Sequence, residues 1–258
     1  VETIDFSYFE RAYSDRRPFF MEGSGIFGME GDVKPFYSRR IGAIDAGLKL
    51  FGRAGRTSFG WMSCADFDRW NLLLVCAGRD LSRNVTGRGS YLRYDEGDLE
   101  SDVLSVRLRW RVKGLSGELS LSGSREGKRR GSRGSASLSY VLGKLFARGS
   151  LAYISPGYSL PVGLLPYQPC KGGSASIVYE DRRFWGGNLL NVGVFGYELK
   201  RYEGGDYIGM ISPWVRLVLR RGEREGCGLT MSFESTRFKR RLAEFRKASM
   251  ASGVGFIL

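Results

Sequence analysis

The clearest pattern in this sequence is a strict alternation of apolar and polar residues between Val103 and Lys113. One set of alternate positions holds Leu104, Val106, Leu108, Trp110 and Val112, and the other holds Ser105, Arg107, Arg109, Arg111 and Lys113. Successive side chains of a β-strand point to opposite faces of the sheet. An alternation with a period of two therefore predicts a strand with one apolar and one polar face.

Segments of this kind, about ten residues long and separated by Gly-rich turns, recur from Ala43 to the C-terminus. A sheet of so many strands has edges with unpaired backbone groups, and closure into a barrel removes those edges. A barrel with an apolar outside is stable in a membrane. We therefore predict an all-β fold, a closed antiparallel outer-membrane-type β-barrel of about 12–14 strands. The predicted strands cover residues 43–53, 56–66, 70–79, 87–95, 102–113, 115–124, 134–143, 146–155, 173–181, 188–200, 207–220, 226–237 and 246–258.

Two kinds of connection separate the predicted strands. Tight turns are expected at 53–56 and 113–114, and longer polar loops at 125–131 and 202–206. Alternation of short and long connections is typical of outer-membrane barrels, so we expect it here.

Residues 1–42 contain aromatic side chains, several glycines and two arginine pairs, but no sustained alternation. We predict an irregular, plug-like lead-in segment at 1–42, followed by a β-barrel at 43–258. The charged residues of this segment can pair with one another and tie it into the mouth of a barrel. The residues expected to anchor it are Arg16, Arg17, Phe19, Phe20, Glu22, Tyr37, Arg39 and Arg40.

Composition supports an ordered chain, because 42% of the 258 residues are hydrophobic and 13% are aromatic. The longest apolar run, Leu72 to Ala77, is far shorter than the ~20 residues that a membrane-spanning helix needs. The sequence therefore excludes a helical membrane protein.

The net charge of +13 fits a nucleic-acid surface, a surface for anionic lipid head groups, or a cationic lumen. Alternation places the charges on one sheet face, which favours a polar interior or a solvated face. Outer-membrane lipid and lipopolysaccharide are the expected partners, and nucleic acid is not expected. An alternative use of the positive charge is to bind phosphate groups of surface glycolipid through loops such as 125–133. We predict a lumen that favours anionic solutes, lined by Lys49, Arg53, Arg107, Arg109, Arg111, Lys113, Arg148, Arg216 and Arg220.

No enzymatic activity, cofactor or metal site is expected. The chain has no histidine, the usual general base of barrels that cleave lipids or peptides. Residues 23–28 match G-x-G-x-x-G, but the strand and helix that flank a dinucleotide-binding turn are missing, so a plain loop is expected. The four cysteines are widely spaced, and Cys64 is expected to face a position near Leu72 and not Cys76.

The lead-in segment contains the strings Asp15-Arg16-Arg17-Pro18-Phe19-Phe20-Met21-Glu22-Gly23 and Phe36-Tyr37-Ser38-Arg39-Arg40-Ile41-Gly42. They resemble a bacterial domain-of-unknown-function family that usually follows a carbohydrate-binding module of the family-nine xylanase type. In that family an R-P-F-F-x-E-G … F-Y-S-R-R-I-G signature precedes many strands. Residues 46–53, 79–84, 153–158 and 162–166 are also similar to it.

The resemblance implies a membrane-associated β-barrel with no established activity. It also names the upstream carbohydrate-binding module, which these 258 residues lack, as a candidate partner. We predict an outer-membrane β-barrel of structural or transport type in a Gram-negative cell envelope. The alternative is a soluble all-β domain whose basic sheet face binds polyanions or glycans.

Overall fold

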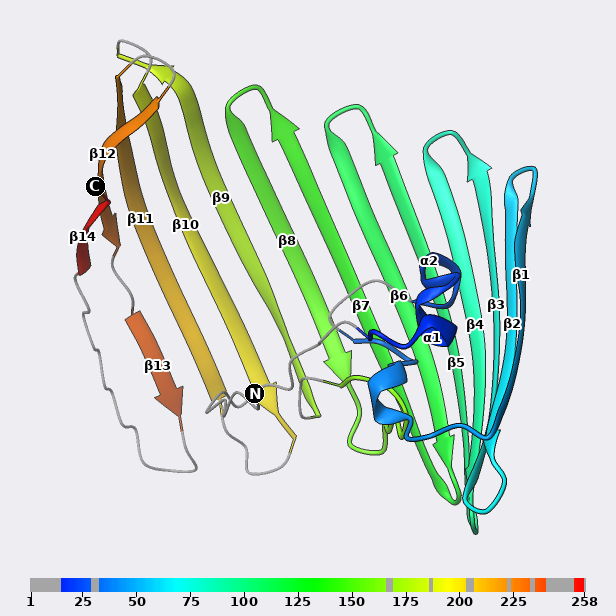
Figure 1. Ribbon diagram of the computed structural model, residues 1–258. Helices are drawn as coiled ribbons and strands as arrows, with labels where there is room; N and C mark the ends of the chain where they lie inside the picture. Colours follow the sequence, from blue (N-terminus) through cyan, green and yellow to red (C-terminus); the bar gives the residue numbers. More distant parts are fainter. Residues whose placement is uncertain are drawn as a thin grey trace. The chain divides into compact units, whose positions relative to one another are not determined.

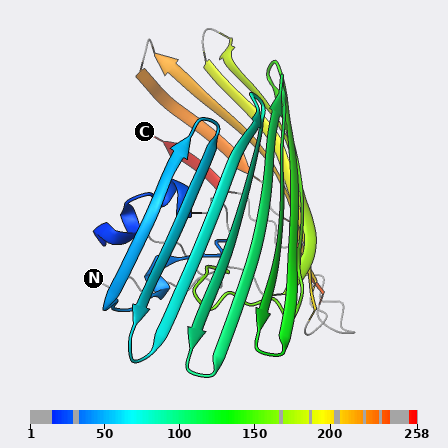
Figure 2. The same ribbon diagram turned by 90° about the vertical axis from the view of Figure 1, so that its right-hand side faces the viewer.

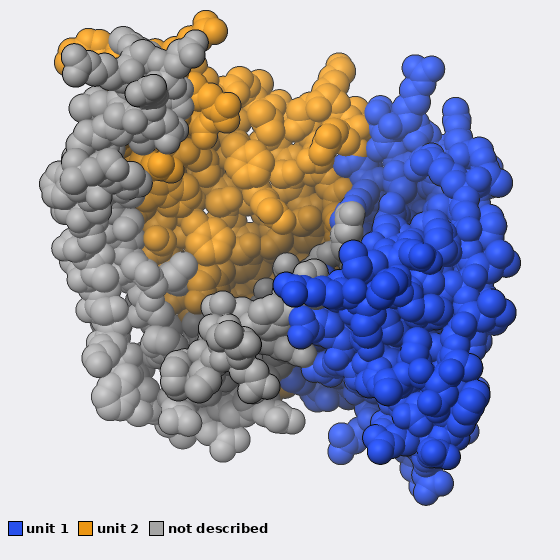
Figure 3. Space-filling view, in the orientation of Figure 1, with its two compact units in different colours: residues 1–110, 119–134, 154–169 blue, residues 111–118, 135–153, 170–258 orange. Residues whose placement is uncertain are grey.

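The computed structural model describes most of the chain as a β-sheet with an irregular segment before it (Figure 1). Contacts divide the chain into two compact units, shown in different colours in Figure 3. Unit 1 comprises residues 1–110, 119–134 and 154–169, and unit 2 comprises 111–118, 135–153 and 170–258. The described residues are 15–28, 33–165, 169–185, 188–202, 207–221, 224–232, 235–239 and 253–257.

The lead-in segment contains three short helical turns, α1 (Pro18–Met21), α2 (Ser24–Phe27) and η1 (Ser38–Arg40). Proline is favoured in the first turn of a helix, where its missing N–H group is not needed, and Pro18 begins α1. Gly23 separates α1 from α2 with a φ of 66°, a left-handed conformation that suits glycine. None of the described helices is long and apolar enough to cross a membrane.

The predicted all-β, antiparallel fold is confirmed. The described strands are β1 (Ala46–Ala54), β2 (Thr57–Asp66), β3 (Trp70–Ser82), β4 (Val85–Glu96), β5 (Leu99–Val112), β6 (Leu115–Glu126), β7 (Arg129–Leu142), β8 (Leu145–Ile154), β9 (Cys170–Phe184), β10 (Asn188–Arg201), β11 (Tyr207–Arg221), β12 (Arg224–Ser232), β13 (Ser235–Lys239) and β14 (Gly253–Ile257). Eleven of the predicted strands coincide with β1 to β11, whereas the predicted strand at 226–237 is divided between β12 and β13.

The strands follow one another in the sheet from β1 to β12, then β14, and β13 pairs with β11. Among the described residues, β1 is hydrogen-bonded to β2 alone, so closure of the sheet stays a prediction. The boundary predicted between residues 42 and 43 likewise stays a prediction.

The predicted alternation of short and long connections is wrong for the first eight strands. Every connection from β1 to β8 has only two or three residues, and β6 and β7 extend through most of the loop expected at 125–131. Polar residues prolong a hairpin as readily as apolar ones when their backbone groups find partners. Gly55, Gly97, Gly127 and Gly143 have positive φ angles, which two-residue hairpin turns require. The long connection is residues 155–169, between β8 and β9.

The two faces of the sheet differ in chemistry. In β5, Leu104 and Val106 are 58% and 52% exposed, whereas Arg107 on the other face is 4% exposed. We call the face that carries Leu104 the apolar face and the other the opposite face. Strand pairing puts Val75 and Tyr91 on the apolar face beside Leu104. The predicted two-faced strand is thus confirmed in register, and exposure separates its faces from Val103 to Arg107, whereas residues 108–112 are partly or fully exposed on both faces.

Candidate functional site

The lead-in segment packs against the opposite face in unit 1, where its helices α1 and α2 lie beside the first strands (Figure 2). Glycines of β1 and β2 make this close approach feasible. A Cβ atom at Gly47 would lie 2.8 Å from Cζ of Phe19, and one at Gly60 would lie 2.8 Å from Cε1 of Phe27. Because glycine has no Cβ atom, the aromatic rings sit directly on the sheet backbone.

The sheet beneath these rings is apolar in β2 to β5. Met62, Leu74, Leu92 and Val103 are directly opposite one another in successive strands, and each is almost completely buried. The lead-in segment contributes Phe20, Phe27, Val33, Phe36 and Ile41 to the buried side chains of unit 1. The lead-in segment and the opposite face therefore share one hydrophobic core.

Lys49 projects from β1 into the contact with the lead-in segment. Its Nζ donates hydrogen bonds to the carbonyl oxygens of Phe19 and Glu22, the second at 2.7 Å. The same Nζ lies 4.8 Å from the ring centre of Phe19 and 5.5 Å from that of Phe51. Aromatic faces and carbonyl oxygens both stabilise an ammonium group. Lys49, predicted to line a lumen, thus binds the lead-in segment.

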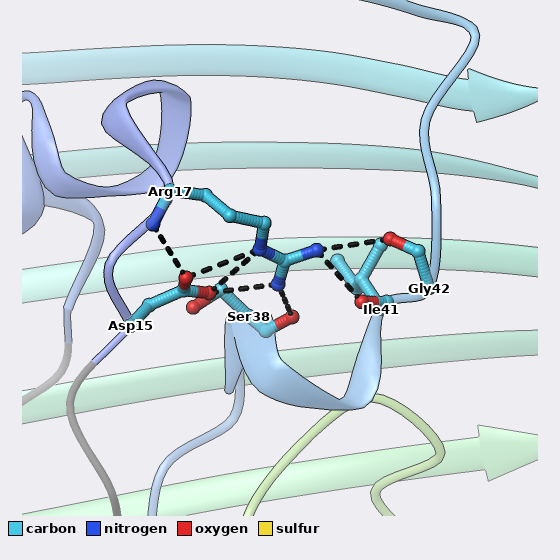
Figure 4. A network of polar contacts seen from close by, with 5 residues as sticks. All are labelled: Asp15, Arg17, Ser38, Ile41 and Gly42. Carbon is cyan, nitrogen blue, oxygen red and sulfur yellow. Dashed lines mark hydrogen bonds and ion pairs between the residues drawn. The ribbon is translucent and has the colours of Figure 1, made fainter.

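Arg17 joins the two strings of the lead-in segment (Figure 4). Its Nη2 is 2.7 Å from Oδ2 of Asp15 and donates to the Ser38 carbonyl oxygen at 2.6 Å. Its Nη1 donates to the carbonyl oxygens of Ile41 and Gly42, both at 2.9 Å. The hydrogen bonds from Arg17 hold the pKa of the Asp15 carboxyl well below its usual range. These groups are satisfied within the segment, so the geometry is that of an anchor.

Acid should loosen this anchor. The pKa of Asp15 is lower in the folded protein, so its stabilising contribution is present above pH ~4 and is lost as the pH falls toward the folded-state value. We expect hydrogen exchange at the amides of Arg40 and Ile41, corrected for intrinsic rates, to rise as the pH is lowered below ~4. Asp15→Asn should raise this exchange already at neutral pH and remove the pH dependence. Equal acid sensitivity of both proteins would refute the assignment to Asp15.

The connection between β8 and β9, like the lead-in segment, packs over the opposite face in unit 1. Its Tyr158 hydroxyl donates to Oγ of Ser122 at 2.8 Å, and Ser122 also contacts Ser105 at 2.8 Å. The backbone N–H of Ser159 donates to Oγ of Ser124 at 3.0 Å. Serines on the opposite face of β5 and β6 thus bind this connection, which the sequence analysis did not single out as a site.

The same connection is joined to the lead-in segment. The backbone groups of Lys34 and Leu164 exchange hydrogen bonds of 3.0 and 2.8 Å, and the N–H of Tyr37 donates to the Val162 carbonyl at 2.7 Å. Nη1 of Arg40 is 3.4 Å from the Leu160 carbonyl oxygen. Residues 153–166 were noted only for their family resemblance, which was the sole sequence signal for this contact.

The predicted anchoring residues occupy different environments. Arg17, Phe19 and Phe20 contact the sheet or other parts of the segment, and Glu22 contributes its carbonyl oxygen to Lys49. Tyr37 and Arg40 bind the β8–β9 connection. Arg16 and Arg39 are exposed.

Three predicted lumen residues, Arg107, Arg109 and Arg111, lie on the opposite face of β5 and become more exposed toward the end of the strand. Lys113 lies in the β5–β6 turn, with a φ of 52°. In unit 2, hydrogen bonds place other polar groups on one face: Ser116 with Ser139, Ser150 with Ser174, and Asn191 with Glu180. Arg148 is two residues before Ser150 in β8 and therefore lies on the same face of the sheet. Arg216 is directly opposite Asn191. Arg53 lies in β1, and the side chain of Arg220 is outside the described part.

The described cysteines are buried, and none of them forms a disulfide. Cys64 is directly opposite Leu72, as predicted, and Cys76 is opposite Gly60. Cys170 is the third, whereas the side chain of Cys227 is outside the described part. Residues 23–28 form α2 with its flanking glycines. Among the described residues, no group of three or more Cys, Asp or Glu side chains could hold a metal ion.

The family model described as "Domain of unknown function (DUF5916)" matches residues 2–50 of this chain. The matched range includes both strings of the lead-in segment and most of β1. No curated protein matches the chain significantly.

Several solved structures are similar to this chain. Acinetobacter baumannii OccAB2 has 9% identity and a TM-score of 0.47, over 78% of this chain and 64% of that chain. Pseudomonas aeruginosa OccK11 (OpdR) has 14% identity and a TM-score of 0.44, over 81% and 68%. Pseudomonas aeruginosa OccK10 (OpdN) has 14% identity and a TM-score of 0.46, over 81% and 70%. The chain spans less than two thirds of the length of OccAB2, and likeness at this level assigns no function.

Proposed function

We propose that this protein is an outer-membrane β-barrel whose apolar face contacts lipid. The observation that carries the proposal is the exposure of large aliphatic side chains in both units. In unit 1, Leu104, Val106 and Leu121 are more than half exposed. In unit 2, Leu151, Ile177 and Ile211 are likewise more than half exposed.

Exposed apolar surface of this extent is unfavourable in water, where contiguous patches beyond a few hundred Å² mark binding or membrane surfaces. Hydrocarbon removes that cost, provided that all backbone hydrogen bonds are made within the sheet. The strands β1 to β11 have 9 to 15 residues, which is enough for a tilted strand of ~9–11 residues to cross a bilayer. Closure of the sheet then follows from the need to remove its edges.

The opposite face supports a lumen that is polar and positively charged. Where the lead-in segment and the β8–β9 connection do not cover it, this face carries Arg109 and Arg111 of β5 and Arg148 and Ser150 of β8. An arginine-lined passage attracts anions. We propose a role in transport or envelope structure, with a preference for anionic solutes where the lumen conducts.

Two measurements test the proposal. Membrane fractionation should recover the protein with the outer membrane, with release by detergent and altered gel migration on heating. Planar-bilayer recordings under a KCl gradient should give a reversal potential of the sign expected for anion preference. Cation preference or the absence of a pore would contradict the transport role. Recovery in the soluble fraction would overturn the barrel and favour a soluble domain that binds polyanions or glycans.

A further inference from the structure

Unit 1 contains a small basic cavity between α2 and one end of strands β1 to β4. Its volume is about 180 Å³, several times the ~30 Å³ share of one water molecule in the liquid. The charged residues that line it are Arg53, Arg56, Arg79, Arg88 and Asp80. Arg79 follows Gly78 in β3, so its side chain points to the apolar face, and the three other guanidinium groups against one carboxylate leave a formal charge of +2 at the cavity.

The single carboxylate is already engaged. Oδ2 of Asp80 is 2.7 Å from Nη2 of Arg53, and its Oδ1 accepts a hydrogen bond from Thr86 at 3.3 Å. Arg53 also donates through Nε to the Gly55 carbonyl at 3.0 Å. The positive charge of the cavity therefore comes from Arg56 and Arg88.

Arg56 and Arg88 retain donors for a ligand. Arg88 uses Nη1 to donate to the Gly25 carbonyl of α2 at 3.3 Å, which leaves most of its five N–H donors available. Within the part of the chain that the structure describes, the side chain of Arg56 makes no hydrogen bond or ion pair. Arg56 thus lines the cavity with a guanidinium group that has no protein acceptor.

The floor of the cavity is shaped by a glycine. A Cβ atom at Gly78 would lie 2.7 Å from Oγ of Ser58 and 3.3 Å from Cγ of Arg88. The absence of a side chain at this position lets Arg88 and Ser58 approach the same point of the sheet. The sheet and α2 therefore hold these groups in place before a ligand binds.

We propose that this cavity binds a phosphate group, as inorganic phosphate or as the head of a phosphomonoester. Guanidinium groups form paired, charge-assisted hydrogen bonds with phosphate oxygens, and several of them can share one tetrahedral anion. The hydroxyls of Ser58 and Thr86 line the same space, and each can donate to the anion by turning away from its present acceptor, the Gly78 carbonyl or Asp80. The site involves only residues of unit 1 and requires neither closure of the sheet nor conduction.

The test is calorimetric titration of the full chain in a maltoside detergent with inorganic phosphate, at constant ionic strength set with chloride. Arg56→Gln and Arg88→Gln should each weaken phosphate binding about tenfold or more. Asp80→Asn should strengthen binding, because it removes the one negative charge from the lining. Arg83→Gln is the matched control, since Arg83 lies exposed in the β3–β4 turn, outside the cavity lining, and loses the same charge.

A second titration with dihexanoyl phosphatidic acid distinguishes a lipid source from free phosphate. Tighter binding of the short-chain lipid, lost in Arg56→Gln, identifies a lipid headgroup, and tighter binding of inorganic phosphate identifies a free anion. Absence of binding for both probes overturns the proposal. It is equally overturned if Arg83→Gln weakens binding as much as Arg56→Gln, because the effect would then be one of net charge. If the planar-bilayer recordings show an anion-preferring pore but phosphate does not bind, the phosphate site is refuted and the proposed function stands.

Discussion

Leu121→Arg is expected to destabilise the protein in a lipid bilayer by about 2–4 kcal/mol. Leu121 lies near the middle of β6, on the apolar face, with 54% of its surface exposed. In hydrocarbon an arginine at this depth has no water to solvate its guanidinium. The unfolding free energy from urea titration in phosphatidylcholine vesicles measures the loss, and the fraction that migrates as the unheated folded form gives a second readout.

The matched control is Phe67→Arg, in the turn between β2 and β3. Phe67 is 76% exposed, but it lies at a strand end and not at mid-strand. A charge near the membrane interface costs only about 0–1 kcal/mol. If the apolar face were exposed to water, Leu121→Arg would also change stability by less than about 0.5 kcal/mol. Equal small effects from the two substitutions would therefore contradict the lipid-facing assignment.

Phe27→Ala is expected to release the lead-in segment from the sheet. Phe27 is buried, its ring contacts that of Phe51 edge-on at 5.9 Å, and it sits on the backbone at Gly60. Truncating a buried phenylalanine to alanine costs about 3–5 kcal/mol. Because the lead-in segment shares its core with the sheet, we expect this loss of stability to appear as detachment of the segment from the sheet. Trypsin cleavage after Arg16 should accelerate about a hundredfold or more, whereas the Arg17–Pro18 bond resists trypsin.

Met21→Ala is the control for this experiment, because Met21 lies in the neighbouring helix α1 with its side chain exposed. Its cleavage rate should stay close to that of the unmodified protein. Gly60→Ala tests the same contact from the side of the sheet, because the new methyl group would clash with the Phe27 ring. Unchanged proteolysis in both Phe27→Ala and Gly60→Ala would show that this aromatic contact does not hold the segment.

The sequence by itself determined the strands and their two faces. Alternation with a period of two follows from strand geometry, so Leu104 and Arg107 could be placed on different faces before any coordinates were known. The same reasoning located β1 to β11, and counting through the turn near Asp68 paired Cys64 with Leu72. Turn lengths at 125–131 were overestimated, because polarity does not report whether backbone groups are paired.

Only the tertiary structure decided what covers the opposite face. Lys49 alternates like any other lumen candidate, yet its Nζ binds carbonyl oxygens of a segment some thirty residues earlier. Tyr158 and Ser122 are 36 residues apart, and no local pattern predicts their hydrogen bond. The arginines of the basic cavity come from β1, β4 and the β1–β2 turn, and α2 completes it. Periodicity fixes where a side chain points relative to its own strand, whereas contacts between distant segments depend on how those segments pack in three dimensions.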